Sequence, residues 1–161
     1  MRIKTAFVFL AAVAVAATAA AQTKTSGTAT CKQDPLTPVA VGDGPGHALA
    51  VSKAQCTWSK FEIAGQQSKE GVSVAMEDIN GETMTSNGYH TATLANGDKT
   101  VARYQGTSTA KDGKLLTGGG TWTYASGTGK FKGIKGKGTY KATPNADGTV
   151  TFQVDGEYTL P

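Results

Sequence analysis

The chain has 161 residues, with 16 lysines and arginines against 12 aspartates and glutamates, so its formal net charge at pH 7 is +4. This length suits a single domain, and so small a charge argues against a nucleic-acid-binding protein. Two histidines and two cysteines are too few for a convincing zinc site, so we expect neither a metal nor a cofactor.

Residues 1–21 have the pattern of a secretory signal peptide. Arg2 and Lys4 give the positive start, residues 7–17 are apolar, and three alanines ending at Ala21 fit the cleavage site. We expect cleavage near Ala21 and export to the periplasm or the medium. The apolar stretch is shorter than the roughly 20 residues that span a membrane, so we expect no transmembrane anchor; a retained anchor is the alternative.

Residues 22–46 are rich in Thr, Ser, Gly and Pro and predict an irregular N-terminal arm. The two cysteines, Cys31 and Cys56, are an even pair in an exported chain, which predicts one disulfide. Two buried free thiols are the alternative. The bond would tie the arm to a body formed by residues 47–161, and we expect that body to fold without the arm.

From His47 onward, Asn-Gly and Asp-Gly pairs recur, and such pairs favour the positive φ angles of hairpin turns. The segments between them are rich in Thr, Val, Tyr and Ala and show no helical period. They predict an all-β fold of eight antiparallel strands joined in sequence, which favours an up-and-down barrel over the alternative, a β-sandwich. The predicted strands are 48–54, 56–63, 71–79, 83–95, 98–110, 114–125, 133–143 and 149–160.

The most distinctive block is Gly127–Tyr140, GTGKFKGIKGKGTY, whose glycines exclude a helix because each costs about 1 kcal/mol relative to alanine. Together with GGGTW at Gly118–Trp122 and a final GEYTL, it resembles the allene oxide cyclase barrel-like families, which include the dirigent proteins. The likeness covers Asp98 to Tyr158. The first half of the chain matches weakly, and the turn reads SGTG instead of GGTG.

The resemblance implies an eight-stranded, calycin-like barrel, often oligomeric, with a cavity for small apolar molecules. Some members catalyse or steer ring formation in lipids or phenolics. The catalytic positions of the plant cyclases match nothing in this chain, so we assign no catalytic residue, and a homo-oligomer is an expectation only.

Two hairpin turns predict which side chains share a face. A two-residue turn at Asn96-Gly97 pairs His90 with Arg103, and one at Asp112-Gly113 pairs Arg103 with Trp122. The face predicted to line the cavity then holds the candidate ligand-binding residues, which are His90, Arg103, Gln105, Trp122 and Tyr124. A cation over an indole, with an imidazole nearby, could orient the polar head of an apolar ligand.

The pairing leaves alternatives. Arg103 and His90 could face solvent, or Arg103 could be a paired core residue. A slip of one residue at Gly118–Gly120 would move Trp122 and Tyr124 to the opposite face.

A local basic surface is predicted from five lysines, Lys130, Lys132, Lys135, Lys137 and Lys141. It could contact anionic envelope polymers, but a solvated face or a protected sheet edge is the favoured interpretation.

The sequence thus predicts an exported barrel that binds a small apolar or amphipathic molecule. The alternatives are a dirigent- or allene oxide cyclase-like cyclase or isomerase, and an envelope-interaction protein that uses the basic surface. No motif requires an enzyme.

Overall fold

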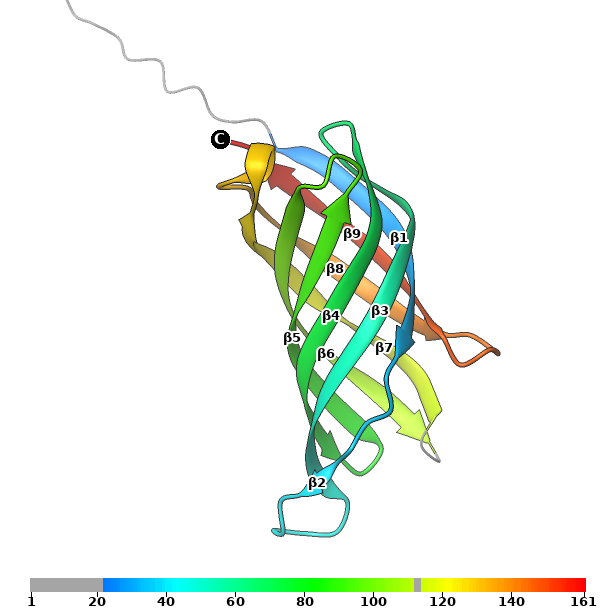
Figure 1. The fold of residues 1–161 in the computed structure, drawn as a ribbon. Helices are drawn as coiled ribbons and strands as arrows, with labels where there is room; N and C mark the ends of the chain where they lie inside the picture. The colour runs from blue at the N-terminus through cyan, green and yellow to red at the C-terminus, as the bar shows by residue number, and fades with distance from the viewer. Residues whose placement is uncertain (1–21, 112–113) are drawn as a thin grey trace, which may run out of the picture.

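The computed structural model describes residues 22–111 and 114–161. The predicted signal peptide and the Asp112-Gly113 turn lie outside these residues. The described chain forms one antiparallel sheet in the order β1-β9-β8-β7-β6-β5-β4-β3-β2, and β1 also pairs with β3. This second pairing closes the sheet into a barrel of eight strands, with the two-residue β2 added along β3 (Figure 1). The predicted all-β, up-and-down barrel is confirmed.

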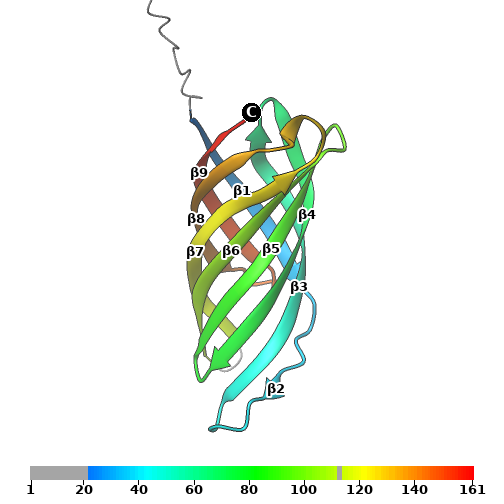
Figure 2. The same cartoon turned by 90° about the vertical axis from the view of Figure 1, so that its left-hand side faces the viewer.

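The strands are long, and most join their neighbours by short turns, so the barrel is tall and narrow (Figure 2). No helix in these ranges is long and apolar enough to cross a membrane. The elements are β1 (Thr23–Gln33), β2 (Val39–Ala40), β3 (His47–Ile63), β4 (Gln66–Asn80), β5 (Thr83–Leu94), β6 (Lys99–Lys111), β7 (Lys114–Gly127), the 3-10 turn η1 (Gly129–Phe131), β8 (Lys135–Pro144) and β9 (Val150–Thr159).

The predicted irregular arm is wrong for its first half, because residues 23–33 form β1, which pairs with both β3 and β9. Thr25, Ala29 and Cys31 alternate as buried residues along it, so its inner face consists of small side chains. Such a face lacks the bulky apolar alternation by which a strand is recognised. The predicted strands 48–54 and 56–63 are a single strand, β3. This error and the unpredicted β1 cancel, so the barrel still has the predicted eight strands.

The cysteines form the predicted disulfide, with an S–S distance of 2.05 Å. Cys31 of β1 lies directly opposite Cys56 of β3, and both are buried. The bond therefore joins two neighbouring barrel strands instead of tethering a loose arm.

One end of the barrel is filled by an apolar cluster of Phe61, Ile63, Leu94, Phe131, Ile134 and Tyr158. Two of these come from the glycine-rich block, whose first half folds over the end of the barrel as η1 and not as strand. Gly129 and Gly133 have φ of +51° and +82°, values that L-residues rarely adopt, and these turns bring Phe131 and Ile134 inside. The second half of the block begins β8 at Lys135.

Candidate ligand-binding cavity

Below this cluster the interior of the barrel contains a cavity of about 180 Å³. It extends from Phe61 of the cluster and Tyr124, which packs against it, to Met84, Leu115 and Val150 at the opposite end of the barrel. A cavity of about 150 Å³ is enough to hold one benzene ring. Most of the wall is aromatic or small and apolar, and its rings belong to Trp58, Phe61, Tyr104, Trp122, Tyr124, Tyr140 and Phe152.

Glycines on neighbouring strands make room for these rings. A Cβ added to Gly88 would stand 2.8 Å from a ring carbon of Tyr104, and one added to Gly138 would stand 2.7 Å from a ring carbon of Trp122. Gly106 similarly faces the Tyr140 hydroxyl. Each ring thus occupies the space that a side chain would fill on the next strand or, for Tyr140 and Gly106, on the strand beyond it, the arrangement known as aromatic rescue of strand glycines. The glycine-rich strands are therefore part of how the wall of the cavity is built.

Of the five candidate ligand-binding residues, the structure brings three to the cavity, which are His90, Trp122 and Tyr124. Arg103 and Gln105 are exposed and do not line it. The predicted pairing of His90 with Arg103 is wrong by one residue, because His90 pairs with Ala102. Binding of a ligand by any of the five stays a prediction.

The shift originates in the β5–β6 turn. The Gly97 N–H donates to the Leu94 carbonyl at 2.9 Å, and the Leu94 N–H donates to the Asp98 carbonyl at 2.8 Å. With Gly97 at φ +86°, this is a three-residue loop closed by a glycine bulge, not the expected two-residue turn. A shift of one residue turns every side chain of β6 to the opposite face, so Tyr104 points inward where Arg103 was expected.

A second register shift, between β6 and β7, returns the side chains of β7 to the face that was predicted for them. Lys111 pairs with Lys114 as predicted, but a bulge follows, and Tyr104 then pairs with Trp122. The exposed Leu116 lies at this bulge. The two shifts cancel, so the faces predicted for β5 and β7 hold while that of β6 is reversed.

His90 is held in one tautomer. The Trp58 indole, which can only donate, donates to His90 Nε2 at 3.3 Å, so the ring proton lies on Nδ1 and is donated to Ser73 Oγ at 2.8 Å. Burial lowers the pKa of His90 to about 4, so the ring is neutral at pH 7. Because Nδ1 carries a proton, His90 does not activate Ser73 as a nucleophile.

The wall of the cavity also contains a carboxylate, and it is not among the five candidate ligand-binding residues predicted from the sequence. Glu77 is 4% exposed, and its two carboxylate oxygens accept hydrogen bonds from Ser52 and Ser86, each at 2.5 Å. Its negative charge also acts on two phenols. Burial first, and Glu77 second, raise the pKa of Tyr140 to about 12 and that of Tyr104 further still. Glu77 therefore lies close to the rings of the cavity.

The inward orientation of Glu77 runs against ordinary apolar patterning. Along β4, Ser73, Ala75 and Glu77 line the interior or are buried, while Val74 and Met76 on the other face are 46% and 60% exposed. Adjacent residues of a strand point to opposite faces, so one of Glu77 and Asp78 had to face inward. Apolar alternation alone would have selected Asp78.

Two hydroxyl groups near the cavity are without a hydrogen-bond partner within the described part of the chain. They are the Tyr124 phenol and Ser108 Oγ, and both residues line the cavity. Buried polar groups are normally paired, so these two are available to a polar group inside the barrel.

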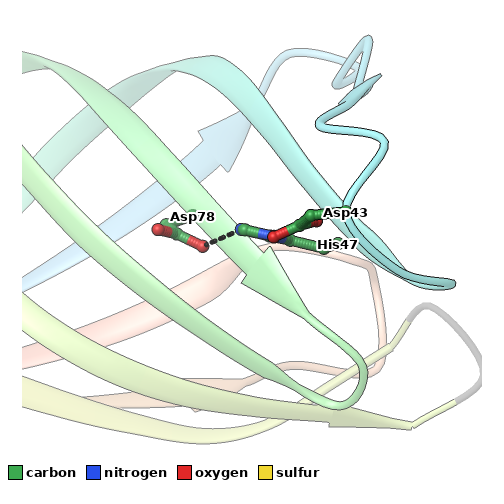
Figure 3. Close-up of polar contacts among 3 residues, drawn as sticks. All are labelled: Asp43, His47 and Asp78. Atoms are coloured by element: carbon green, nitrogen blue, oxygen red, sulfur yellow. Dashed lines mark hydrogen bonds and ion pairs between the residues drawn. The ribbon is translucent and has the colours of Figure 1, made fainter.

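A second titratable cluster lies on the outside, where β3 begins (Figure 3). His47 Nδ1 lies 2.7 Å from Asp43, and Nε2 lies 3.2 Å from Asp78 of β4. The hydrogen bond to Asp43 is the largest cause of a raised pKa at His47. Because both ring nitrogens are occupied by carboxylates, the cluster fastens the loop before β3 and leaves no lone pair for a metal.

The predicted basic surface is exposed, with Lys135, Lys137 and Lys141 along β8. Lys137 lies opposite Glu157, which also pairs with Lys24 at 2.7 Å, and both lysines lower the pKa of Glu157. The surface is thus partly neutralised by its neighbours.

No family model matches this sequence, and no curated protein does. Among solved structures, the barrel resembles the pterocarpan synthase dirigent protein PsPTS1, with a TM-score of 0.52 and 15% identity over 87% of this chain and 96% of that one. A protein of unknown function from the DUF3224 family of Shewanella oneidensis MR-1 matches with a TM-score of 0.46 and 16% identity over 88% of this chain and 98% of that one, a likeness too weak to carry an argument. At such identities a likeness concerns the fold alone. The chain therefore has a dirigent-like barrel fold.

Proposed function

We propose that this protein is exported and binds a small molecule with an apolar or aromatic body inside its barrel. The observation that carries the proposal is the cavity of about 180 Å³, whose wall is mostly apolar, includes several aromatic rings and holds a few fixed polar groups. Ligand sites have this composition, because apolar walls supply affinity and a few polar groups set orientation. The disulfide supports export, since such bonds persist in oxidising compartments.

The test is isothermal titration calorimetry with 2-phenylethanol, a neutral single-ring probe of about the right size. Ala102 lies opposite both His90 and Tyr124, so Ala102→Phe places a ring inside the cavity. We expect the wild-type protein to bind and this variant to bind at least about tenfold more weakly. The matched control is Ala146→Phe, which adds the same ring to an exposed turn and should bind like wild type.

Native mass spectrometry of the purified protein adds a second readout, because a bound small molecule adds a discrete mass. Absence of 2-phenylethanol binding together with absence of any co-purifying mass would overturn the proposal.

A catalytic role of the dirigent type is the second candidate, favoured by the likeness to a pterocarpan synthase dirigent protein. A shaped cavity can steer a reactive intermediate through position and electrostatics. Epoxide and phenoxy-radical substrates should then give an altered stereochemical ratio of products in its presence. Because Arg103 lies outside the cavity, the informative variant is Glu77→Gln, and Arg103→Ala is the control. Unchanged ratios with every substrate would exclude this role.

A further inference from the structure

The charge inside the barrel is of one sign. Among the residues that the structure places around the cavity, Glu77 is the only carboxylate, and none is a lysine or an arginine. His90 is neutral there, and Arg103 and the lysines of residues 22–111 and 114–161 are exposed outside the cavity. A cavity with one negative group and low-dielectric walls attracts cations and repels anions.

The carboxylate of Glu77 is only partly compensated. Ser52 and Ser86 each donate one hydrogen bond to it, which uses about two of its four acceptor positions. No cation of the described chain forms an ion pair with it. A buried charge is costly unless it is paired, and two hydroxyl dipoles do not cancel a full charge. A positive group entering the cavity would complete the pairing.

The aromatic rings near Glu77 also favour a positively charged group in the cavity. The Tyr104 and Tyr140 rings lie edge to face with their centroids 6.0 Å apart, and Phe152 follows at 5.9 Å from Tyr140. Ring faces attract cations, and the effect is largest where water is excluded. The free volume then limits the body of the ligand to about one ring with a short chain.

From these contacts we propose that the barrel selects a small organic cation, an amine carried by a single apolar ring, with its ammonium group against Glu77 and its ring among the aromatic side chains of the wall. The proposal rests on the proposed function and adds the chemical class of the ligand. A neutral alcohol can donate one hydrogen bond to Glu77 but leaves its charge in place, and a carboxylate is repelled by it.

The experiment compares three probes of similar size by calorimetry at pH 7, namely 2-phenylethylamine, 2-phenylethanol and phenylacetate, on the purified protein with its disulfide intact. We expect the amine to bind about tenfold more tightly than the alcohol, because a hydrogen bond between two charged groups is stronger than one from a neutral hydroxyl to the same carboxylate. Phenylacetate should bind most weakly, because its charge has the same sign as that of Glu77. Glu77→Gln should remove the advantage of the amine and change alcohol binding by less than about threefold. Glu70→Gln is the matched control, since it removes the same charge from an exposed position on the same strand.

The outcomes separate the two proposals. If no probe binds and native mass spectrometry finds no co-purifying mass, the proposed function fails. If the alcohol binds and the amine binds no more tightly, the cavity binds ligands but the inference of a cationic ligand is wrong. If Glu77→Gln does not fold, the wild-type ranking decides, together with nuclear Overhauser contacts between the aminomethylene protons of the amine and Glu77. Absence of those contacts in a formed complex would overturn the inference.

Discussion

The surroundings of the two histidines shift their pKa values in opposite directions. His90 is buried against Trp58 and Ser73, so desolvation lowers its pKa to about 4. His47 lies between two carboxylates at the surface, so its pKa is raised. The residue type alone predicts neither result, because each shift comes from burial or from the partners that the fold places around the ring.

The raised pKa of His47 gives the contact a defined pH dependence. Because the charged form is favoured in the folded protein, the stabilisation is fully present below the ordinary histidine pKa and is lost as pH rises through the raised value. In Asp43→Asn we expect the pKa of His47 to fall toward about 6.5, since the largest cause of its shift is removed. An NMR titration of the His47 ring protons measures this. Asp34→Asn, an exposed change elsewhere, should leave it in place, and an unshifted pKa in Asp43→Asn would contradict the assignment.

Among the elements, the strands in the second half of the chain contain glycines at positions where an aromatic ring covers the backbone. Gly138 of β8 lies opposite both Trp122 of β7 and Gly156 of β9, and the indole occupies the space over the two glycines. Glycine usually weakens a strand, so alanine would be the better residue if only propensity mattered. Here packing reverses the sign, because a methyl group would collide with the ring and the backbone.

We therefore expect Gly138→Ala to destabilise the protein by about 1–3 kcal/mol, the usual cost of overpacking. Its Cβ would stand 2.7 Å from Trp122 and from the Gly156 Cα, and closer still to the Asp155 carbonyl. Urea unfolding followed by tryptophan fluorescence measures the loss. Gly44→Ala is the control, since nothing lies within 4 Å of its added Cβ. Equal stability of the two variants would show that the indole does not depend on the glycines.

For the whole molecule, closure of the barrel makes the N-terminal strand part of the cooperative unit. Strand β1 supplies the pairing partner of both β3 and β9, so its loss would leave two open sheet edges. From this topology we expect, contrary to the prediction from the sequence, that residues 47–161 do not fold without the preceding segment. Oligomeric state stays a prediction of the family resemblance.

The disulfide should accordingly act on the whole barrel. It closes a loop with a sequence separation of 25 residues, and Cys31→Ser with Cys56→Ser should lower the free energy of unfolding by about 3 kcal/mol. We expect a single transition in urea, with amide exchange in β1 accelerated together with that in β3 and β9. Exchange that accelerates in residues 23–33 alone, while the other strands keep their protection, would show that this segment behaves as a separate arm.

Local patterns predicted much of this fold correctly. The Asn-Gly and Asp-Gly turns and the segments rich in Thr, Val, Tyr and Ala between them depend on neighbouring residues. They therefore predicted most strands, their antiparallel order and a barrel. The cysteine pair predicted the disulfide because an even number of cysteines and an expected export suffice for that prediction. Strand β1 was not predicted because its inner face consists of Thr25, Ala29 and Cys31, whose small side chains give no clear apolar alternation.

Only the tertiary structure decided which side chains face the cavity. Asn96-Gly97 fits both two- and three-residue loops, and contacts with a distant segment accompany the longer one: Asp98 accepts the Lys130 N–H at 3.3 Å, and Thr128 Oγ1 accepts the Lys99 N–H at 2.8 Å. That one residue turned Arg103 outward and Tyr104 inward. Glu77 faces inward for the same kind of reason, because Ser52 and Ser86 on adjacent strands solvate its carboxylate inside the barrel. Such pairings join residues far apart in the sequence, so no local pattern along the chain contains them.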